Sequence, residues 1–466
     1  MPCPNGRCEG SPLGGQLAHQ VAKMDAVDEE LGIDRAAFEA DLAALQHALD
    51  LVVDPPVTDP LALDALPAHM PEEGIGPTAA IDLVAQIALP RASSLRDPLA
   101  AARMATPTPW LTWAAAVWSA ARSENLLHKA DTPQVNALQD RVLDWLAPVW
   151  GMTTGHLVPG GTIANLTALW AARDGSGATT VVTSESASTS VTKVARVLGM
   201  PLIRIDSDAD ERLNLDAFVD FARRDPDGMS RVAVVLTAGT QNTGAIDPIR
   251  EAMKSLRNIG LEPAWWHVDA SWAGPLALSS RYRGQLKGID GADSVTVSAH
   301  KMMFQPTESA LVMFKDAEKS DAVLEFAGPD DTRQIGLLGS RADRSLAIAL
   351  LLLAYGQDGL ASWVDAGIGA MMAVAEALHG RDDVEVFNSP VSGVLLWRPL
   401  LKDTDAVLER LGRKVAGPGF ADGRKWVRQV GSNPLMNVYE LIERINAALD
   451  DPAMESAPDP HRTAEM

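Results

Sequence analysis

Cysteine is scarce in this chain, whose 466 residues include only Cys3 and Cys8. Both stand in a stretch near the N-terminus that is rich in Gly and Pro. Two thiols cannot brace a chain of this length, and a structural metal site would need two further ligands. We therefore expect reduced thiols and no metal site.

Basic residues are outnumbered as well, with 40 Lys and Arg against 61 Asp and Glu, a net charge of −21. An acidic chain repels nucleic-acid phosphates and anionic lipids, so neither is expected as a partner. The longest apolar run, Ser345–Tyr355, is far shorter than the roughly 20 residues that cross a bilayer. No pattern of a secretion signal opens the chain, and we expect a cytoplasmic location.

The length of the chain predicts more than one domain. Apolar spacing predicts helices over 25–50, 110–122 and 135–150, and residues 52–110 are rich in Pro and Ala. We expect an N-terminal tail and wrapping helical segment, a large domain, a small α/β domain and a disordered tail, over residues 1–110, 111–355, 356–450 and 451–466.

Short β-rich runs alternate with helical patterns in the middle of the chain. The runs are 179–183, 202–205, 231–237, 264–269, 294–298 and 310–314. Because they are almost continuously apolar, they predict a mostly parallel α/β sheet that helices cover on both faces. Further on, the pattern predicts strands 393–398 and 425–430 among helices 340–356, 360–378, 403–411 and 438–449.

A possible anion site comes first among the motifs, in Pro159-Gly160-Gly161-Thr162 just before a predicted helix. Glycines let a backbone approach an anion, and the free N–H groups of a helix N-terminus attract one. Thr162 adds a hydroxyl. The same residues also make an ordinary turn, which is the commoner case for this motif alone.

Two charged residues follow at the ends of predicted strands. Asp269 ends the strand Trp266-His267-Val268, where a buried carboxylate is costly unless it has a cationic partner. That partner could belong to a ligand. Alternatively, Asp269 caps a helix or forms a structural ion pair within the protein. Lys301 follows His300 after the strand 294–298. If its amine is buried, its pKa falls and it becomes a good Schiff-base former. A lone lysine after a strand is more usually a solvated surface residue.

The three motifs are more specific together than singly. Parallel sheets place functional residues at the carboxyl ends of their strands. The 32 positions that separate Asp269 from Lys301 allow one crossover and a return to that edge. We therefore expect the glycine motif, the carboxylate and the amine to meet in one crevice.

These motifs resemble the group II decarboxylases of fold type I, which depend on pyridoxal 5′-phosphate (PLP). The stretch His267–Met303 is most similar to the glutamate and cysteine-sulfinate branch. Ala238-Gly239-Thr240, Asp247-Pro248 and Ser432-Asn433-Pro434 also match, so the resemblance covers about residues 100–450. It implies a seven-stranded sheet domain, a small C-terminal domain, and a homodimer with the active site at the subunit interface.

The resemblance also implies roles for single residues. Lys301 would hold PLP as a Schiff base and Asp269 would bind the pyridine nitrogen. The residues implied around the phosphate and ring are Gly161, Thr162, Ser188, Thr240, Ser271, Ser298 and His300. Arg428 would hold a substrate carboxylate or brace the small domain, and Trp110, with Trp113 and Leu126, matches a region that shapes the substrate pocket in relatives.

Two departures from the family bear on the reaction. Ser188 stands where relatives carry a histidine that stacks on the PLP ring. The region 316–339, where relatives often use a tyrosine to protonate the carbanion, contains no Tyr. A hydroxyl cannot stack and is a poor general acid.

The expected reaction is decarboxylation of an L-amino acid to the amine through a quinonoid carbanion. The departures favour an alternative, in which the carbanion meets an aldehyde or O₂ and the products are a C–C adduct or an aldehyde. A third hypothesis is an inactive relative that serves as a binding subunit, and retention of Asp269, His300 and Lys301 argues against it. The identity of the amino acid is left open.

Overall fold

The computed structural model describes residues 35–56, 64, 66–71, 73–89, 95–122, 125–127, 131–325 and 334–451. Cys3, Cys8 and the predicted tail beyond residue 451 lie outside the described residues. The chain divides into two compact units, Met1–Ser94 and Leu95–Met466, which are described separately. The expected boundaries at 110, 355 and 450 stay a prediction.

The first unit contains two packed helices, α2 (Arg35–Val53) and α3 (Pro77–Ala88). The helix predicted over 25–50 corresponds to α2 in its described part. His47 of α2 joins Asp82 of α3, with 2.6 Å between Nε2 and Oδ1. Pro77 starts α3, a position where its missing N–H costs no hydrogen bond.

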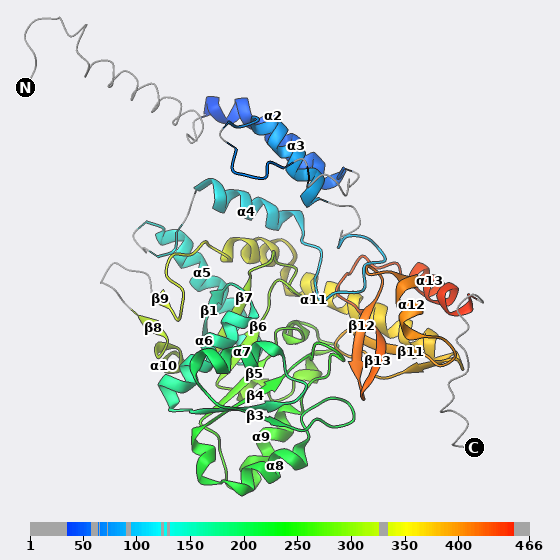
Figure 1. Cartoon of the computed structure of the whole chain (residues 1–466). Helices are drawn as coiled ribbons and strands as arrows, with labels where there is room; N and C mark the ends of the chain where they lie inside the picture. The colour runs from blue at the N-terminus through cyan, green and yellow to red at the C-terminus, as the bar shows by residue number, and fades with distance from the viewer. Residues whose placement is uncertain are drawn as a thin grey trace, which may run out of the picture. The chain divides into compact units, whose positions relative to one another are not determined.

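The second unit is built on a seven-stranded sheet (Figure 1). Its order is β1 (Thr154–Val158), β7 (Ala310–Phe314), β6 (Ser294–Val297), β5 (Trp265–Asp269), β4 (Val232–Thr237), β2 (Thr180–Ser184) and β3 (Leu202–Ile205). All strands run parallel except β7, which is antiparallel to both neighbours. The six predicted strands are confirmed within a residue or two. Strand β1 was not predicted, because its Thr-Gly-His start interrupts the apolar run.

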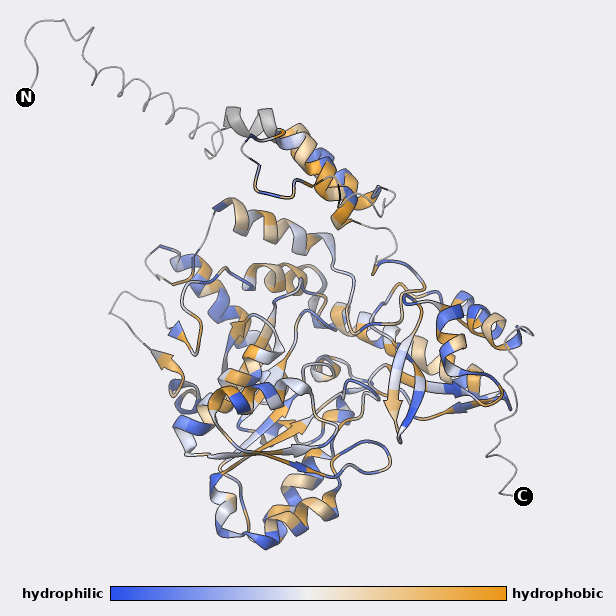
Figure 2. Cartoon of the chain, viewed as in Figure 1, coloured by the Kyte–Doolittle hydropathy of each residue, from blue (hydrophilic) through white to orange (hydrophobic). Residues whose placement is uncertain are grey.

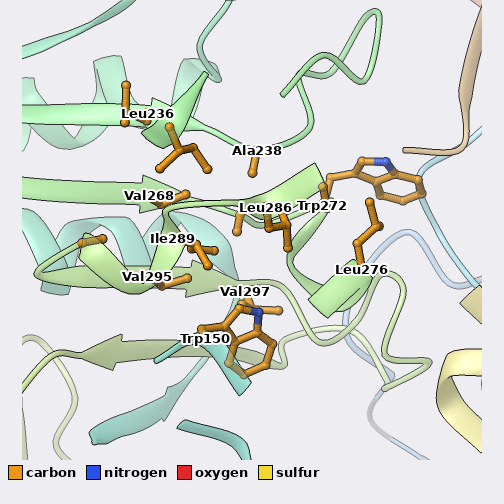
Figure 3. Close-up of a cluster of buried hydrophobic side chains, with 14 of the residues drawn as sticks. Trp150, Leu236, Ala238, Val268, Trp272, Leu276, Leu286, Ile289, Val295 and Val297 are labelled. Atoms are coloured by element: carbon orange, nitrogen blue, oxygen red, sulfur yellow. The ribbon is translucent and has the colours of Figure 1, made fainter. Parts of the chain in front are cut away.

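Helices cover both faces of this sheet, as the apolar strands predicted. Alternate residues of β4 point to opposite sides, so Ala233 and Val235 pack with α6 and α7 while Val234 and Leu236 pack with α5, α8 and α9. Figure 2 shows hydrophobic residues along the central strands. Figure 3 shows buried side chains of β4, β5 and β6, with Trp150 beside Val297 of β6. These helices are α5 (Pro133–Leu146), α6 (Gly161–Ser176), α7 (Thr189–Leu198), α8 (Leu215–Arg224), α9 (Ile249–Asn258) and α10 (Ala317–Asp321). Helix α4 (Trp110–Arg122) packs instead on the long helix α11 (Ser345–His379).

A smaller antiparallel sheet follows in the C-terminal part, in the order β10 (Val384–Val386), β11 (Val394–Pro399), β13 (Arg424–Val430) and β12 (Gly417–Ala421). Helices α12 (Thr404–Leu411) and α13 (Val438–Asp450) begin at Asp403 and Asn437, whose side chains accept backbone N–H groups. The sequence predicted β11 and β13 only. Strand β12 contains Pro418, which is tolerated because β12 is an edge strand.

One long helix, α11 (Ser345–His379), joins the two sheets. It spans both helices predicted for this region, but it begins five residues after the predicted start at residue 340, and Gly356 interrupts it with a φ of 65°. By length and composition α11 could cross a membrane. In this fold, Leu351, Val364 and Ile368 are buried against the rest of the second unit, while Leu353 of the same helix is 71% exposed.

The chain before α4 packs on the small sheet. The N–H groups of Ala101 and Ala102 donate to Lys414 O, and Val430 N donates to Ala101 O. Thr106 then donates to the carbonyl oxygen of Lys301 at 2.7 Å. Residues 97–106 therefore connect the small sheet to the loop that carries Lys301.

Candidate active site

A cavity of about 570 Å³ lies where the parallel strands end. Its walls come from the loops after β1, β2, β4, β5 and β6, and from β13 of the small sheet. All nine residues expected around the cofactor line it: Gly161, Thr162, Ser188, Thr240, Asp269, Ser271, Ser298, His300 and Lys301. The structure thus brings together residues that lie up to 140 positions apart, because parallel strands end at one edge of the sheet.

The glycine motif forms a cradle at one end of the cavity. Helix α6 begins at Gly161, and no side chain caps it, so its first N–H groups are available to an anion. A Cβ on Gly161 would stand 2.6 Å from Ser298 Oγ and 2.7 Å from Ser271 Oγ. A side chain at this position would displace these two hydroxyls, whereas glycine leaves them beside the helix N-terminus, so that backbone and hydroxyl donors converge as a phosphate requires.

Asp269 lies at the base of the cavity and is 3% exposed. Its Oδ2 accepts a hydrogen bond from Asn165 Nδ2 at 2.8 Å, and its Oδ1 accepts one from Ser271 N at 3.1 Å. No salt bridge joins it to a basic residue in the described part of the chain. A buried carboxylate held in this way suits a protonated ring nitrogen.

Lys301 enters the same cavity from the turn after β6. Burial lowers the pKa of its amine, Asp269 partly opposes the shift, and the positive charge of Arg428 adds to it. Because only the neutral amine attacks a carbonyl, this lower pKa favours Schiff-base formation.

His300 also faces the cavity, and its Nδ1 donates to the carbonyl oxygen of Ser309 at 3.0 Å. Burial is the main cause that lowers the pKa of His300, and nearby Lys301 adds to the effect. The neutral ring leaves Nε2 without a proton. His300 can therefore donate to a phosphate only when it is protonated, which a bound dianion favours.

The loop after β4 carries Thr240 to the cavity. Gly239 has a φ of 97°, and a Cβ there would stand 2.7 Å from Cδ1 of Trp272. Thr240 Oγ1 lies 2.8 Å from Thr243 Oγ1 and accepts from Ala245 N at 3.0 Å. Its backbone is held as well, because Thr240 N donates to Ala245 O and Thr240 O accepts from Gly244 N.

Ser188 lines the cavity and caps helix α7 at the same time. Its Oγ accepts a hydrogen bond from Ser190 N at 3.2 Å. A side chain of this size leaves open the space that a ring would fill.

Two arginines line the cavity, whereas the tryptophan that the resemblance placed near the substrate does not. Arg428 on β13 lines the cavity, and its Nε is buried with no hydrogen-bond partner among the described residues. Arg103 lines the cavity too and was not predicted, because no motif surrounds it. Trp110 is 63% exposed and does not reach the cavity of this chain, so its predicted role stays a prediction, as do those of Trp113 and Leu126.

A family model described as the pyridoxal-dependent decarboxylase conserved domain matches residues 60–398. L-2,4-diaminobutyrate decarboxylase of Rhizobium meliloti (strain 1021) is 29% identical over 93% of this chain and 96% of its own length. Aromatic-L-amino-acid decarboxylase of Bacillus atrophaeus is 27% identical over 65% of this chain and 70% of its own. These relatives bear the names of other decarboxylases, so the glutamate and cysteine-sulfinate branch is only one of several that the chain is similar to.

A solved structure gives the fold comparison. The glutamate decarboxylase domain of diaminobutyrate-pyruvate transaminase and L-2,4-diaminobutyrate decarboxylase from Vibrio parahaemolyticus matches with a TM-score of 0.78. The match is 21% identical and covers 90% of this chain and 96% of the other. At this identity the likeness concerns the fold alone, and it confirms the expected fold type I architecture. Since the family model spans most of the chain and the cradle, carboxylate and amine that PLP needs meet in one cavity, the chain belongs to the pyridoxal-dependent decarboxylases, enzymes that remove a carboxyl group from an amino acid with PLP.

Proposed function

We propose that this enzyme converts an L-amino acid to the corresponding amine and CO₂, with Lys301 as the residue that carries PLP. The observation behind the proposal is that Lys301, Asp269 and the Gly161 cradle line one cavity. When bound, PLP supplies an electron sink for the electron pair that remains when the carboxylate leaves. The chain itself supplies binding, orientation and charge.

The residues of the cavity divide this work. The cradle of Gly161 N–H, Ser271 and Ser298 holds the phosphate, and Asp269 holds a positive charge at the far end of the ring. The neutral amine of Lys301 exchanges with the substrate amine and is then free to move protons at the reacting carbon.

We propose that Arg428 holds a carboxylate of the substrate. Burial lowers the pKa of its guanidinium to about 10, which still leaves it charged at neutral pH. Burying a cation without a carboxylate partner costs desolvation free energy, and an anionic ligand that pairs with the cation offsets this cost. Arg103 faces the same cavity and supplies a second positive charge.

An amino-acid panel with PLP tests the function. The panel contains L-2,4-diaminobutyrate and aromatic, acidic and aliphatic amino acids. The assay measures the CO₂ and the amine that are released, and we expect the two in equal amounts. A visible absorbance band that borohydride fixes on the protein checks the cofactor. CO₂ without amine would reject the proposed product, and a protein that never binds PLP would revive the inactive binding subunit.

A second product is favoured by Ser188, whose hydroxyl caps α7 and leaves the ring space open. In an oxidative reaction the amino acid consumes O₂ and water and gives an aldehyde, CO₂, ammonia and hydrogen peroxide. In the other case the carbanion forms a C–C bond with an aldehyde. Both follow from poor protonation of the carbanion.

The substitution Ser188→His restores an aromatic ring and a general acid at this position. We expect the ratio of amine to aldehyde and peroxide to rise severalfold, because proton transfer from a placed acid is worth about 10²–10⁴ in rate. Product analysis under air and under argon measures the ratio. Ser186→His, which places a ring nearby but outside the cavity, is the control. An unchanged ratio in Ser188→His would show that this position does not control the product.

We also propose a homodimer with the active site at the subunit interface. On helix α4, Trp110 and Trp118 have 63% and 51% of their surface exposed. Exposed apolar side chains of this size, close together on one helix, are typical of a surface that another protein chain covers. Light scattering is expected to give twice the mass of one chain, and Trp118→Asp to give monomers that bind PLP poorly. Val197→Asp, at an exposed position of α7, is the matched control. A monomeric parent protein that is fully active would contradict the dimer.

A further inference from the structure

A line of buried polar side chains runs behind Asp269, away from the cavity. Strand β5 alternates, so Trp265, His267 and Asp269 share the face that α6 covers, while Trp266 and Val268 face the other core. Neighbouring strand β6 places Ser294 opposite His267 in register, and α6 brings Asn165 above them. Of this line, the structure places only Asp269 in the wall of the cavity.

Each member of the line contacts the next. Trp265 Nε1 lies 2.8 Å from Ser294 Oγ, and Ser294 Oγ lies 2.8 Å from His267 Nδ1. His267 Nε2 lies 3.1 Å from Asn165 Oδ1, and Asn165 Nδ2 lies 2.8 Å from Asp269 Oδ2. Ser294, His267 and Asn165 are all 0% exposed, so no solvent competes for these hydrogen bonds.

The direction of the hydrogen bonds is determined at both ends. A carboxylate only accepts, so the amide nitrogen of Asn165 faces Asp269 and its oxygen faces His267. His267 Nε2 must then carry the proton. An indole only donates, so Ser294 accepts from Trp265 and its own proton goes to His267 Nδ1.

The ring of His267 is therefore neutral, with the proton on Nε2. Burial lowers its pKa to about 4, although the charge of Asp269 and the contact with Ser294 act in the opposite direction. A second proton on Nδ1 would leave the hydroxyl proton of Ser294 without an acceptor. With His267 neutral, every hydrogen bond in the line donates toward Asp269, and each one polarises the next.

We propose that Trp265, Ser294, His267 and Asn165 form a positioning relay that keeps the carboxylate of Asp269 oriented toward the pyridine nitrogen of PLP. The relay donates to Oδ2 and Ser271 N donates to Oδ1, so one donor on each oxygen sets the plane of the carboxylate. The relay residues touch neither PLP nor substrate, so their effect passes through Asp269. The inference rests on the proposed roles of Asp269 and Lys301.

A loss of the relay has a spectroscopic consequence. A carboxylate of Asp269 that is turned away from the pyridine nitrogen leaves this nitrogen less protonated. The loss of that positive charge makes the nearby Schiff-base nitrogen more basic. The pH midpoint of the Schiff-base absorbance therefore moves up. The other titratable groups at the cavity, Arg103, His300 and Arg428, are the same in parent and variants.

The experiment compares His267→Phe, which keeps a ring and removes both hydrogen bonds, with the parent enzyme. Expected results are PLP affinity about tenfold weaker and an absorbance midpoint about one pH unit higher, the size of one hydrogen bond to a charged group. Ser294→Ala should change PLP affinity and the absorbance midpoint in the same direction but by less, because Ser294 lies farther from Asp269 along the relay. Asp269→Asn should give the largest shift.

A matched pair of controls exists in the same sheet. His156 of β1 is also buried, and its Nε2 lies 2.7 Å from Ser320 Oγ, but neither residue lines the cavity. His156→Phe and Ser320→Ala should leave PLP affinity and midpoint at the parent values. Thermal melting of each apo-protein separates a general loss of stability from the effect on PLP.

The outcomes distinguish the relay from the proposed function. A parent that shows no Schiff-base band rejects the roles of Lys301 and Asp269, and the relay with them. A parent with the band and folded His267→Phe and Ser294→Ala variants with unchanged midpoints rejects the relay alone. Equal shifts in the His156 and His267 variants reject it as well, since any buried histidine would then have the same effect.

Discussion

Replacing Lys301 with alanine is expected to remove the borohydride-stable adduct and to reduce CO₂ release by on the order of 10³-fold or more, the scale on which loss of a covalent catalytic group acts. Two functions disappear together in this variant. The amine no longer bonds to the aldehyde carbon of PLP, and no amine is left beside the reacting carbon to move protons.

The effect should be local. The backbone around Lys301 keeps its contacts, because its carbonyl accepts from Thr106 Oγ1 and its N–H donates to Ser298 O. The phosphate cradle at Gly161 and the carboxylate of Asp269 do not depend on the lysine side chain. Lys301→Ala should therefore still bind PLP reversibly and melt near the parent temperature.

Peptide mass mapping after borohydride gives the direct measurement. In the parent the added mass should lie on the peptide that contains Lys301. Lys193→Ala removes an exposed lysine of α7 and is expected to behave as the parent. An adduct that persists in Lys301→Ala, or that maps to another lysine in the parent, would show that the cofactor is carried elsewhere.

Substitution of Arg428 by methionine is expected to lower kcat/KM about 100-fold, because hydrogen bonds to charged groups contribute about 1.5–3 kcal/mol each. Methionine has similar length and no charge, so the cavity keeps much of its shape. The loss should arise from binding of the substrate carboxylate, since Nε of Arg428 has no hydrogen-bond partner among the described residues.

The product amine offers a test within the same variant. It lacks the carboxyl group that has left, so its inhibition constant should change less than twofold if Arg428 holds that carboxylate. Arg424→Met, at the exposed start of the same strand, is the matched control and should leave kcat/KM unchanged. Equal losses for substrate and amine, together with a lower melting temperature, would instead make Arg428 a brace of the small domain.

Local sequence determined much of this protein. The apolar runs fixed six of the seven strands of the large sheet, because strands buried on both faces need continuous apolar residues. The order of the glycine motif, Asp269 and Lys301 was enough to expect one crevice, since residues that follow parallel strands must meet at one edge. The replacement of a stacking histidine by Ser188 was also visible in the sequence.

Tertiary structure alone decided the rest. Arg103 reaches the cavity from the segment packed on the small sheet, and no local pattern encodes a contact over such a separation. The family resemblance implied Arg428 near the site, and the fold shows that β13 carries it into the wall of the cavity. Strand β7 pairs antiparallel with both β1 and β6, a direction that an apolar run does not encode. The relay from Trp265 to Asp269 needs a strand register and a helix crossing, and Asn165 and Asp269 stand 104 positions apart. Hydrogen bonds of this kind depend on where elements pack, which is why the sequence showed the residues of the site but the fold showed what holds them in place.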